Sequence, residues 1–402
     1  MTTTAEPEPF APPDALDEAS AHLPPASPTP LWRRIDRLVM VVFAIGISIP
    51  AVVMLIGLRP APIENRPLLT PPPASAEALL DPEFFGALDD FLADNVILKP
   101  LAVELKAEVD TKLGATSNPE VIPGVGDWLF TRSELILKCT YTADDIATML
   151  DETAAAFMAA GQDFRFIAIP DKHAIYPDRL PTDVDLPTPC SDERRAAMRN
   201  ALAERSAWAI DGWGPLLAAR AADPTGVRLY HAQDTHWAPA GASHAIKALV
   251  GTIEPAVWSD AEVVQTGTKD APQDLARQLG LTRTEKTPQY RMRSGVDVDR
   301  RAMDIPVKLT NARAVYRITA TGDGPFIGGR TVFIYDSFFG RVMAQVAPFF
   351  GESVWVHMND LKEHPELASA IRPADRVILA RVERGLYTTD ISTLLSPLVG
   401  AR

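Results

Sequence analysis

The pattern of hydrophobic and polar positions separates the first sixty residues from the rest of the chain. Residues 1–34 are rich in Pro, Ala, Thr, Ser and acidic residues and have few large apolar side chains. Such a segment buries too little apolar surface to fold, so we expect a disordered tail. Leu38 to Leu58 then form a run of 21 residues without a charge. A helix of this length can cross a hydrocarbon core of about 30 Å, which predicts a single transmembrane anchor over 35–58.

The flanks of the apolar run indicate its orientation. Arg33, Arg34 and Arg37 precede it, whereas Arg59 and Arg66 follow more sparsely. This asymmetry favours a cytoplasmic N-terminus, with everything after residue 60 in the periplasm or otherwise outside the cytoplasm. A buried soluble helix and a cleavable signal peptide are the alternatives. The run is longer than a usual signal sequence and no small-x-small cleavage site follows it, so we expect an uncleaved anchor in the cytoplasmic membrane.

Residues 59–118 predict a linker followed by a helical stalk. Pro60 to Ala74 is Pro-rich and should be extended. From Phe84 to Leu113 apolar residues recur at helical spacing, with a break at Pro100 and an end at Gly114.

Strands and helices alternate over residues 119–402. A capping box at Thr142 and Asp145 begins the first helix. Helices are predicted over 142–157, 191–208, 239–253, 340–349, 361–371 and 389–397, and strands over 164–169, 331–335, 354–357 and 377–382. Strands separated by helices predict a mainly parallel sheet covered on both faces, that is, an α/β domain. The interval 287–330 has alternating patches and should be an antiparallel insertion.

Charge and cysteine content limit the partners and the chemistry. The formal net charge of −13 argues against general affinity for nucleic acid or for an anionic membrane face. The chain has two cysteines, Cys139 and Cys190. In an oxidising compartment they could form one disulfide, and two isolated buried thiols are the alternative.

Two short motifs carry candidate catalytic residues. Asp234-Thr235-His236-Trp237 places an Asp two residues before a His, and Asp336-Ser337-Phe338 follows a predicted strand. A serine hydroxyl becomes a good nucleophile when a neighbouring base takes its proton and a third group orients that base. Ser337, His236 and Asp234 supply these three parts. The alternatives are that Asp336 and Ser337 only cap a helix and that Asp234 and His236 lie in an ordinary polar loop.

A metal site is a further alternative for the histidines. His231, Asp234, His236 and His244 are residue types that bind zinc. Their spacing matches no usual ligand pattern, so we expect neither a metal ion nor a cofactor.

Five motifs in order resemble the alginate O-acetyltransferase AlgJ/AlgX-like family of SGNH-hydrolase-like proteins, over roughly residues 60–400. They are Glu64-Asn65-Arg66-Pro67-Leu68, Gly124-Val125-Gly126-Asp127-Trp128-Leu129-Phe130, Pro170-Asp171-Lys172-His173-Ala174-Ile175-Tyr176-Pro177 and the two catalytic motifs above. The permuted order, with the Asp and His before the Ser, is shared with this family. The N-terminal anchor makes the chain look closer to AlgJ than to AlgX. The resemblance implies an SGNH-hydrolase-like three-layer α/β/α domain over 119–402.

The resemblance also implies roles and partners. Ser337 would be the nucleophile, His236 the base and Asp234 its orienting carboxylate. The protein would be a membrane-anchored O-acetyltransferase that acetylates an extracytoplasmic polysaccharide through an acetyl-Ser intermediate. A multi-spanning membrane-bound O-acyltransferase would export the acetyl group. A carbohydrate acetyl esterase and a non-catalytic subunit of a polysaccharide export complex are the rival functions.

Some positions depart from the family pattern or have open roles. Tyr335 precedes Asp336 where a Gly is usual, and Gln273 replaces the Gly of a Gly-Asp-Leu block. Lys172 and Tyr176 could line an acceptor groove or could be structural. Arg341 is expected at the surface.

Overall fold

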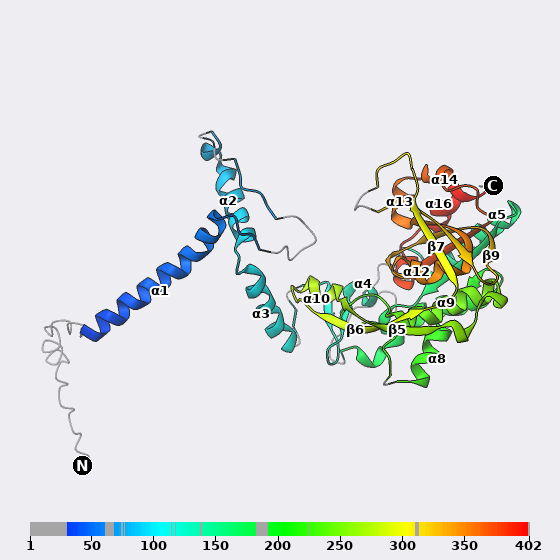
Figure 1. Cartoon of the computed structure of the whole chain (residues 1–402), viewed down its shortest axis with the longest axis horizontal. Helices are drawn as coiled ribbons and strands as arrows, with labels where there is room; N and C mark the ends of the chain where they lie inside the picture. Colours follow the sequence, from blue (N-terminus) through cyan, green and yellow to red (C-terminus); the bar gives the residue numbers. More distant parts are fainter. Residues whose placement is uncertain are drawn as a thin grey trace, which may run out of the picture. The chain divides into compact units, whose positions relative to one another are not determined.

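The computed structural model describes residues 30–60, 68–73, 75, 77–113, 115–116, 118–136, 139–181, 192–224, 226–309 and 313–400. Within the chain, contacts define two units, one of 1–62 with 66–100 and one of 63–65 with 101–402 (Figure 1). Most of the predicted tail over 1–34 and residues 61–67 of the predicted linker lie outside the described residues.

The first unit contains the helices α1 (Pro30–Leu55) and α2 (Pro82–Asn95). Asp81 begins α2 by accepting a hydrogen bond from the N–H of Glu83. Over the described residues, no helix combines the length and the apolar character that a membrane crossing requires. The transmembrane anchor expected over 35–58 stays a prediction.

The predicted stalk helix is two helices, as the position of Pro100 indicated. α2 ends at Asn95, and α3 (Lys99–Lys112) begins just before the proline. Proline fits the first turn of a helix, where its missing N–H leaves no intrahelical bond unmade.

A sheet of seven strands forms the centre of the second unit. Its order is β4 (Ala209–Ile210), β3 (Asp163–Ile169), β11 (Arg376–Val382), β9 (Ile327–Tyr335), β10 (Phe350–His357), β8 (Tyr316–Gly322) and β7 (Val296–Ala302). The first five strands are parallel to one another, β8 is antiparallel to β10, and β7 is antiparallel to β8. This confirms a mainly parallel sheet and places much of the predicted antiparallel insertion at one edge of it.

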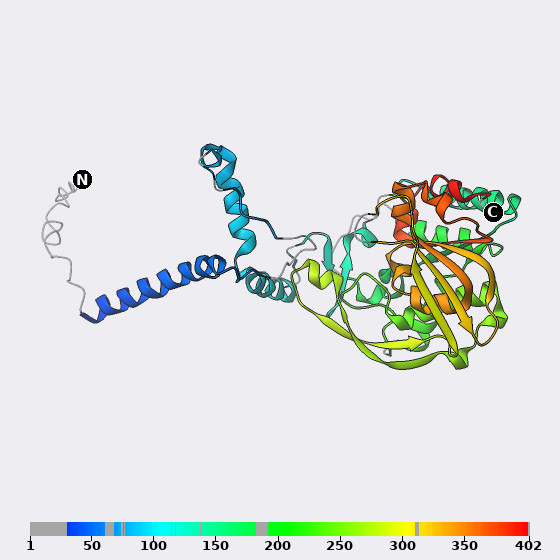
Figure 2. The same ribbon diagram turned by 45° about the horizontal axis from the view of Figure 1, so that its top comes forward.

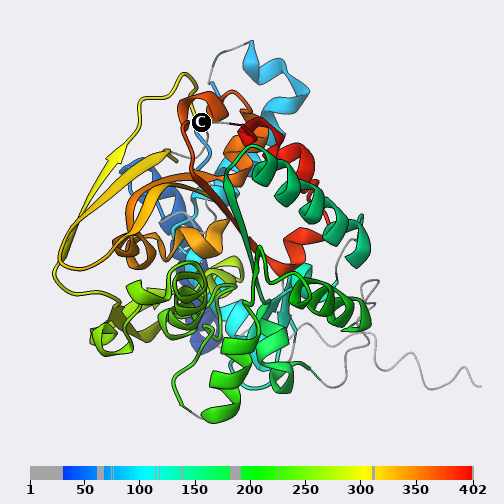
Figure 3. The same ribbon diagram turned by 90° about the vertical axis from the view of Figure 1, so that its right-hand side faces the viewer.

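Helices cover both faces of the sheet, so the expected α/β/α layering is confirmed (Figure 3). On one face α5 (Ala143–Ala159), α7 (Asp192–Ala203) and α16 (Ile391–Leu395) pack against residues such as Val332 and Ile334. On the other face α9 (Pro239–Ile253) packs near Phe333 and Trp355. Successive residues of β9 therefore enter opposite cores, as the alternation of side chains along a strand requires.

A long hairpin stands apart from the main sheet. Its strands, β5 (Val264–Pro272) and β6 (Thr284–Arg291), pair with each other, and α10 (Asp274–Gln278) lies in their connection (Figures 1 and 2). β1 (Val121–Pro123) and β2 (Leu129–Thr131) form a second small pair. The remaining short helices are α4 (Arg132–Leu135), α6 (Lys172–Ile175), α8 (Gly214–Ala222), α11 (Ser337–Gly340), α12 (Met343–Val346), α13 (Met358–Glu363), α14 (Leu367–Ala370) and α15 (Glu383–Leu386).

Three predicted helices are shorter or more broken than expected. The helix predicted over 340–349 is replaced by α11, α12 and a 3-10 turn over Ala347–Phe349, which contains Pro348. The helix predicted over 361–371 is split into α13 and α14 around Pro365. Proline removes a helical hydrogen bond and disfavours helical geometry at the residue before it, which accounts for the break at Pro365, where His364 leaves helical geometry. α7 ends at Ala203 rather than near residue 208.

The cysteine question is partly answered. Cys139 is disulfide-bonded. Cys190 lies outside the described residues.

Candidate active site

Ser337 lies directly after the central strand β9, at the first residue of the one-turn helix α11. Asp336 fixes this turn, since its carboxylate accepts the N–H of Phe338 at 3.0 Å and the N–H of Val382, in β11, at 2.7 Å. Asp336 thus takes the capping role, and the side chain of Ser337 is exposed. Because α11 is a single turn, the helix dipole expected behind the serine is small.

His236 comes from a loop that precedes α9. The loop is closed by an antiparallel bridge between Tyr230 and Trp237. The indole N–H of Trp237 donates to the carbonyl of Phe338 at 3.1 Å. The residues next to the candidate base and next to the candidate nucleophile are therefore hydrogen-bonded to each other.

The structure brings together the three side chains predicted for the site. Ser337 Oγ lies 2.9 Å from His236 Nε2, and His236 Nδ1 lies 2.7 Å from Asp234 Oδ1. Asp234 has no exposed surface and His236 is 6% exposed, so water competes little for these bonds. With its proton on Nδ1, the imidazole presents a lone pair at Nε2 to the serine hydroxyl. The arrangement is that of an activated serine, and the catalytic role of each residue stays a prediction.

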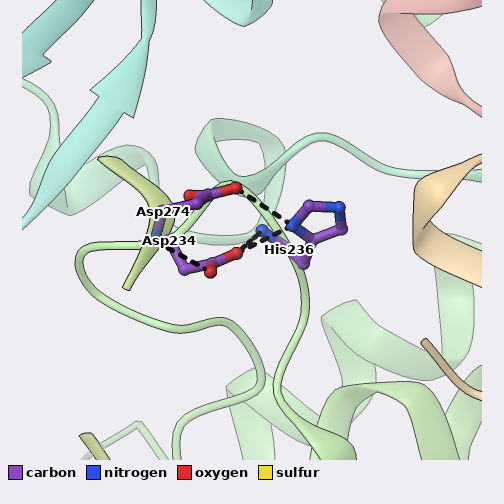
Figure 4. Close-up of side chains that lie close together, drawn as sticks. All are labelled: Asp234, His236 and Asp274. Atoms are coloured by element: carbon purple, nitrogen blue, oxygen red, sulfur yellow. Dashed lines mark hydrogen bonds and ion pairs between the residues drawn. The ribbon is translucent and has the colours of Figure 1, made fainter. Parts of the chain in front are cut away.

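Asp274 is a fourth member of the cluster that the sequence analysis did not include. Its Oδ2 lies 3.3 Å from His236 Nδ1 (Figure 4). Thr235 binds the same carboxylate through its backbone N–H at 2.7 Å and its hydroxyl at 2.6 Å. In return the N–H of Asp274 donates to Asp234 Oδ2 at 3.1 Å. The only signal in the sequence was the modified Gln273-Asp274-Leu275 block.

Arg341 is a fifth member; it is exposed, as expected of a surface residue, and it also reaches the carboxylates of the site. Its Nη1 lies 3.2 Å from Asp234 Oδ2 and its Nη2 lies 3.9 Å from Asp274 Oδ2. The side chain is 40% exposed, so one end of the guanidinium reaches the carboxylates while the rest contacts solvent. Arg341 directly follows α11 and so lies one helical turn after Ser337.

The partners of both carboxylates favour their charged forms. Burial alone would raise the pKa of Asp234, but the hydrogen bond from His236 and the charge of Arg341 hold it well below its usual value. Burial and the charge of Asp234 would likewise raise the pKa of Asp274, but hydrogen bonds from His236 and Thr235 outweigh them and lower it. The two carboxylates lie where they can stabilise the positive charge that a general base acquires when it takes a proton.

The metal alternative takes a different form from the one considered above. Asp234, His236 and Asp274 place possible ligand atoms within 4.8 Å of one another. His231 instead lies beside Glu285, with its Nδ1 3.4 Å from Oε2, and His244 lies in α9. Because hydrogen bonds from His236, Thr235 and Arg341 already engage both carboxylates, protein donors account for the cluster.

Lys172 and Tyr176 have structural positions rather than positions in a groove. Lys172 is fully buried, and its ammonium donates to the carbonyls of Asp234 at 2.9 Å and Ala232 at 3.2 Å, and also to that of Leu129. Burial lowers the pKa of Lys172 to about 8, although the charge of Glu134 opposes this effect. The hydroxyl of Tyr176 accepts the N–H of Leu229 at 2.8 Å. Both residues hold the loop that carries His236.

A second buried charge group lies behind the site. Asp171 accepts the N–H of Arg384 at 3.0 Å and is also paired with the guanidinium of that residue. The guanidinium lies 5.4 Å from the ring of Phe338, which in turn is 4.7 Å from the imidazole of His236. Burial raises the pKa of Asp171 to about 6, although the charge of Arg384 opposes it.

This raised pKa predicts a pH dependence of stability. Below about pH 4 Asp171 is protonated in both the folded and the unfolded state. Between about pH 4 and about pH 6 the folded state binds the proton more tightly than the unfolded state. Raising the pH through this window should therefore lower the free energy of unfolding of the wild type relative to Asp171→Asn, by up to about 3 kcal/mol. Urea unfolding of both proteins at pH 4, 5, 6 and 7 measures the difference. If the free energies of unfolding of the two proteins changed with pH in the same way, the raised pKa of Asp171 would be contradicted.

Comparisons with known proteins agree with the motifs. Residues 121–311 match the family model of the SGNH hydrolase-like domain of the acetyltransferase AlgX, which confirms the resemblance inferred from the sequence. The matched segment includes Asp234, His236 and Asp274 and ends before Ser337. No curated protein matches the chain significantly.

Among solved structures, the chain is similar to the O-acetyltransferase domain of Pseudomonas putida AlgJ, with 16% identity, a TM-score of 0.47, and coverage of 71% of this chain and 100% of that one. PatB1 of Bacillus cereus is 12% identical, with a TM-score of 0.45 and coverage of 67% of this chain and 98% of that one. AlgX of Pseudomonas aeruginosa is 11% identical, with a TM-score of 0.41 and coverage of 69% of this chain and 67% of that one.

Proposed function

We propose that this chain, which carries an SGNH hydrolase-like domain of the AlgX acetyltransferase family, transfers acetyl groups onto hydroxyls of an extracytoplasmic polysaccharide. The observation that supports this most is the 2.9 Å contact between Ser337 Oγ and His236 Nε2, with Asp234 at 2.7 Å behind the imidazole. A serine, a base and a buried carboxylate in series are suited to acyl transfer through a covalent intermediate.

In the first half-reaction Ser337 Oγ attacks the carbonyl carbon of an acetyl donor while His236 Nε2 takes the serine proton. The tetrahedral intermediate expels the donor's leaving group, which takes the proton back from His236, and acetyl-Ser337 remains. Asp234 and Asp274 stabilise the imidazolium that forms between these steps.

In the second half-reaction a sugar hydroxyl replaces the leaving group. His236 takes its proton as the oxygen attacks the acetyl carbonyl, and the proton returns to Ser337 Oγ when the acetyl ester leaves. Water in place of the sugar would give acetate instead. The ring of Phe338 covers one side of the imidazole, with its centroid 4.7 Å from that of His236, and packs on Trp237 at 5.8 Å.

The location and partners of the protein belong to the same proposal. The chain is anchored in the cytoplasmic membrane through residues 35–58, with its catalytic domain in the periplasm. Support comes from the uncharged run Leu38–Leu58, its arginine-rich N-terminal flank and the exposed apolar side chains of α1, such as Leu38 and Phe43. Since acetyl-CoA is a cytoplasmic donor, a membrane-bound O-acyltransferase would have to export the acetyl group to this enzyme.

A partition experiment tests transfer. The purified full chain is given a chromogenic acetyl ester, with and without the deacetylated extracellular polysaccharide of the source organism. Because both products come from one acetyl-Ser intermediate, the glycan should lower free acetate and raise ester-linked acetyl on the polymer by the same amount, as measured by NMR and acetate assay.

Each rival function gives a different result. A carbohydrate esterase would release the same acetate with or without the glycan and would deacetylate the native polymer. A non-catalytic subunit would show no turnover above that of Ser337→Ala.

A further inference from the structure

We propose that Asp274 is a second positioning residue for the base, so that two carboxylates hold the imidazole of His236. The inference rests on the proposed roles of Ser337 and His236. It extends them by assigning a function to a residue that lies 40 positions after Asp234 along the chain.

The contacts of Asp274 differ from those of a capping or surface aspartate. Its Oδ2 is 3.3 Å from His236 Nδ1, compared with 2.7 Å for Asp234 Oδ1, so both carboxylates face the same ring nitrogen (Figure 4). Asp274 is the first residue of α10 and not its N-cap. The N-cap is Gln273, whose side chain makes no capping hydrogen bond. Its oxygens are instead bound by Thr235, the residue between Asp234 and His236.

The connection of the β5–β6 hairpin is built to hold Asp274 in this position. The N–H groups of Leu275 and Ala276 donate to the carbonyl of Gln233 at 3.0 and 3.2 Å, which ties α10 to the loop of His236. The other side of α10 is buried in a small apolar cluster whose members are Ala107, Val121, Leu129, Leu275, Ala276, Leu279 and Leu281. Beside this cluster, Arg283 pairs with Glu108 of α3 at 2.6 Å.

A shared nitrogen makes the two carboxylates partly interchangeable. When Asp234 is replaced by Asn, the Nδ1 proton can still be accepted by Asp274 Oδ2 after a small shift of the ring. In a triad with one carboxylate the same replacement costs about 10⁴-fold in rate, largely because the imidazole takes the wrong tautomer. We therefore expect Asp234→Asn to lose only about 10²-fold here, and Asp274→Asn about 10-fold, while the double variant loses about 10⁴-fold.

The experiment measures the serine directly. Full-length wild type and the variants Asp234→Asn, Asp274→Asn and the double variant are treated with an aromatic sulfonyl fluoride. Ser337 Oγ forms a bond to sulfur, fluoride leaves, and His236 takes the serine proton. The second-order rate of labelling is followed by intact mass. Asp270→Asn is the matched control, because Asp270 is an exposed aspartate in β5 of the same hairpin.

A pH profile of labelling separates positioning from a merely structural effect. Asp274→Asn removes a carboxylate that lies 3.3 Å from His236 Nδ1, so the acid limb of its labelling profile should lie at lower pH than that of the wild type. Asp270→Asn should leave both the rate and the profile unchanged. Thermal unfolding of each variant verifies that the protein is folded at the temperature of the assay.

The outcomes distinguish this inference from the function on which it rests. Labelling of wild type at Ser337, with Asp274→Asn within twofold of wild type and an unmoved profile, would overturn the role of Asp274 alone. So would a full 10⁴-fold loss in Asp234→Asn to which Asp274→Asn adds nothing. Absence of labelling at Ser337 in the wild type would overturn the proposed nucleophile, and the present inference with it.

Discussion

Replacing Ser337 with alanine should lower acetyl turnover by at least about 10⁴-fold, because it removes the hydroxyl that is hydrogen-bonded to Nε2 of the base His236. The variant should remain folded. The serine side chain is exposed, and the turn that carries it is held by Asp336 through the N–H groups of Phe338 and Val382. The measurement is the steady-state rate with a chromogenic acetyl ester, together with intact mass after mixing.

The controls for this prediction separate the serine from its surroundings. Ser369→Ala removes an exposed hydroxyl of α14 and should keep full activity. His236→Ala should be nearly as inactive as Ser337→Ala, and the double variant no worse, since the two residues act as a unit. Wild type should carry an acetyl adduct that adds about 42 Da to its mass, and Ser337→Ala should not. Undiminished turnover in Ser337→Ala would remove the nucleophile from the mechanism.

The second large effect is expected for Lys172→Met. This change removes a buried ammonium whose hydrogen bonds go to the carbonyls of Leu129, Ala232 and Asp234. Breaking a buried charged network by removing one partner costs about 3–5 kcal/mol, because the carbonyls left behind lose a charged donor that water cannot replace. Urea unfolding at pH 7 should show this loss, and the remaining folded protein should react more slowly because the loop of His236 has lost its support.

Lys362→Met is the matched control for this substitution. Lys362 is exposed in α13, so the same change there should alter the free energy of unfolding by less than about 0.5 kcal/mol. A Lys172→Met protein with wild-type stability and wild-type labelling of Ser337 would contradict the structural role given to the lysine.

The sequence was sufficient for the local features of the fold. The capping box of Thr142 and Asp145 is present at the start of α5, and the helix that begins at Pro239 runs to Ile253 as predicted. The predicted strands lie within β3, β9, β10 and β11, whose apolar runs identify strands that are buried on both faces. The helix predicted over 340–349 is interrupted at Val342, which leaves helical geometry, and it changes to a 3-10 turn at Ala347–Phe349, although Val342 and Val346 are buried as the apolar spacing indicated.

The site could be predicted only where its parts are adjacent in sequence or follow a strand. Asp234 and His236 are two residues apart, and Ser337 follows β9, so residue type and local context were informative. Asp274 and Arg341 lie 40 and 107 residues from Asp234, and their contacts with it depend on how α10 and the turn after α11 pack. No local pattern encodes such contacts. Lys172 was ambiguous for the same reason, since its burial is a property of the folded loop.

The contrast between the exposed Ser337 and the almost fully covered His236 has a kinetic consequence. Under the proposed function, the acetyl donor would approach the side chain of Ser337 from solvent, and the sugar would approach its acetyl ester from the same side. The two substrates would then occupy the site alternately, and the spent donor would have to depart before the glycan enters. The proposed function therefore predicts a ping-pong order, in which an excess of one substrate slows the half-reaction of the other.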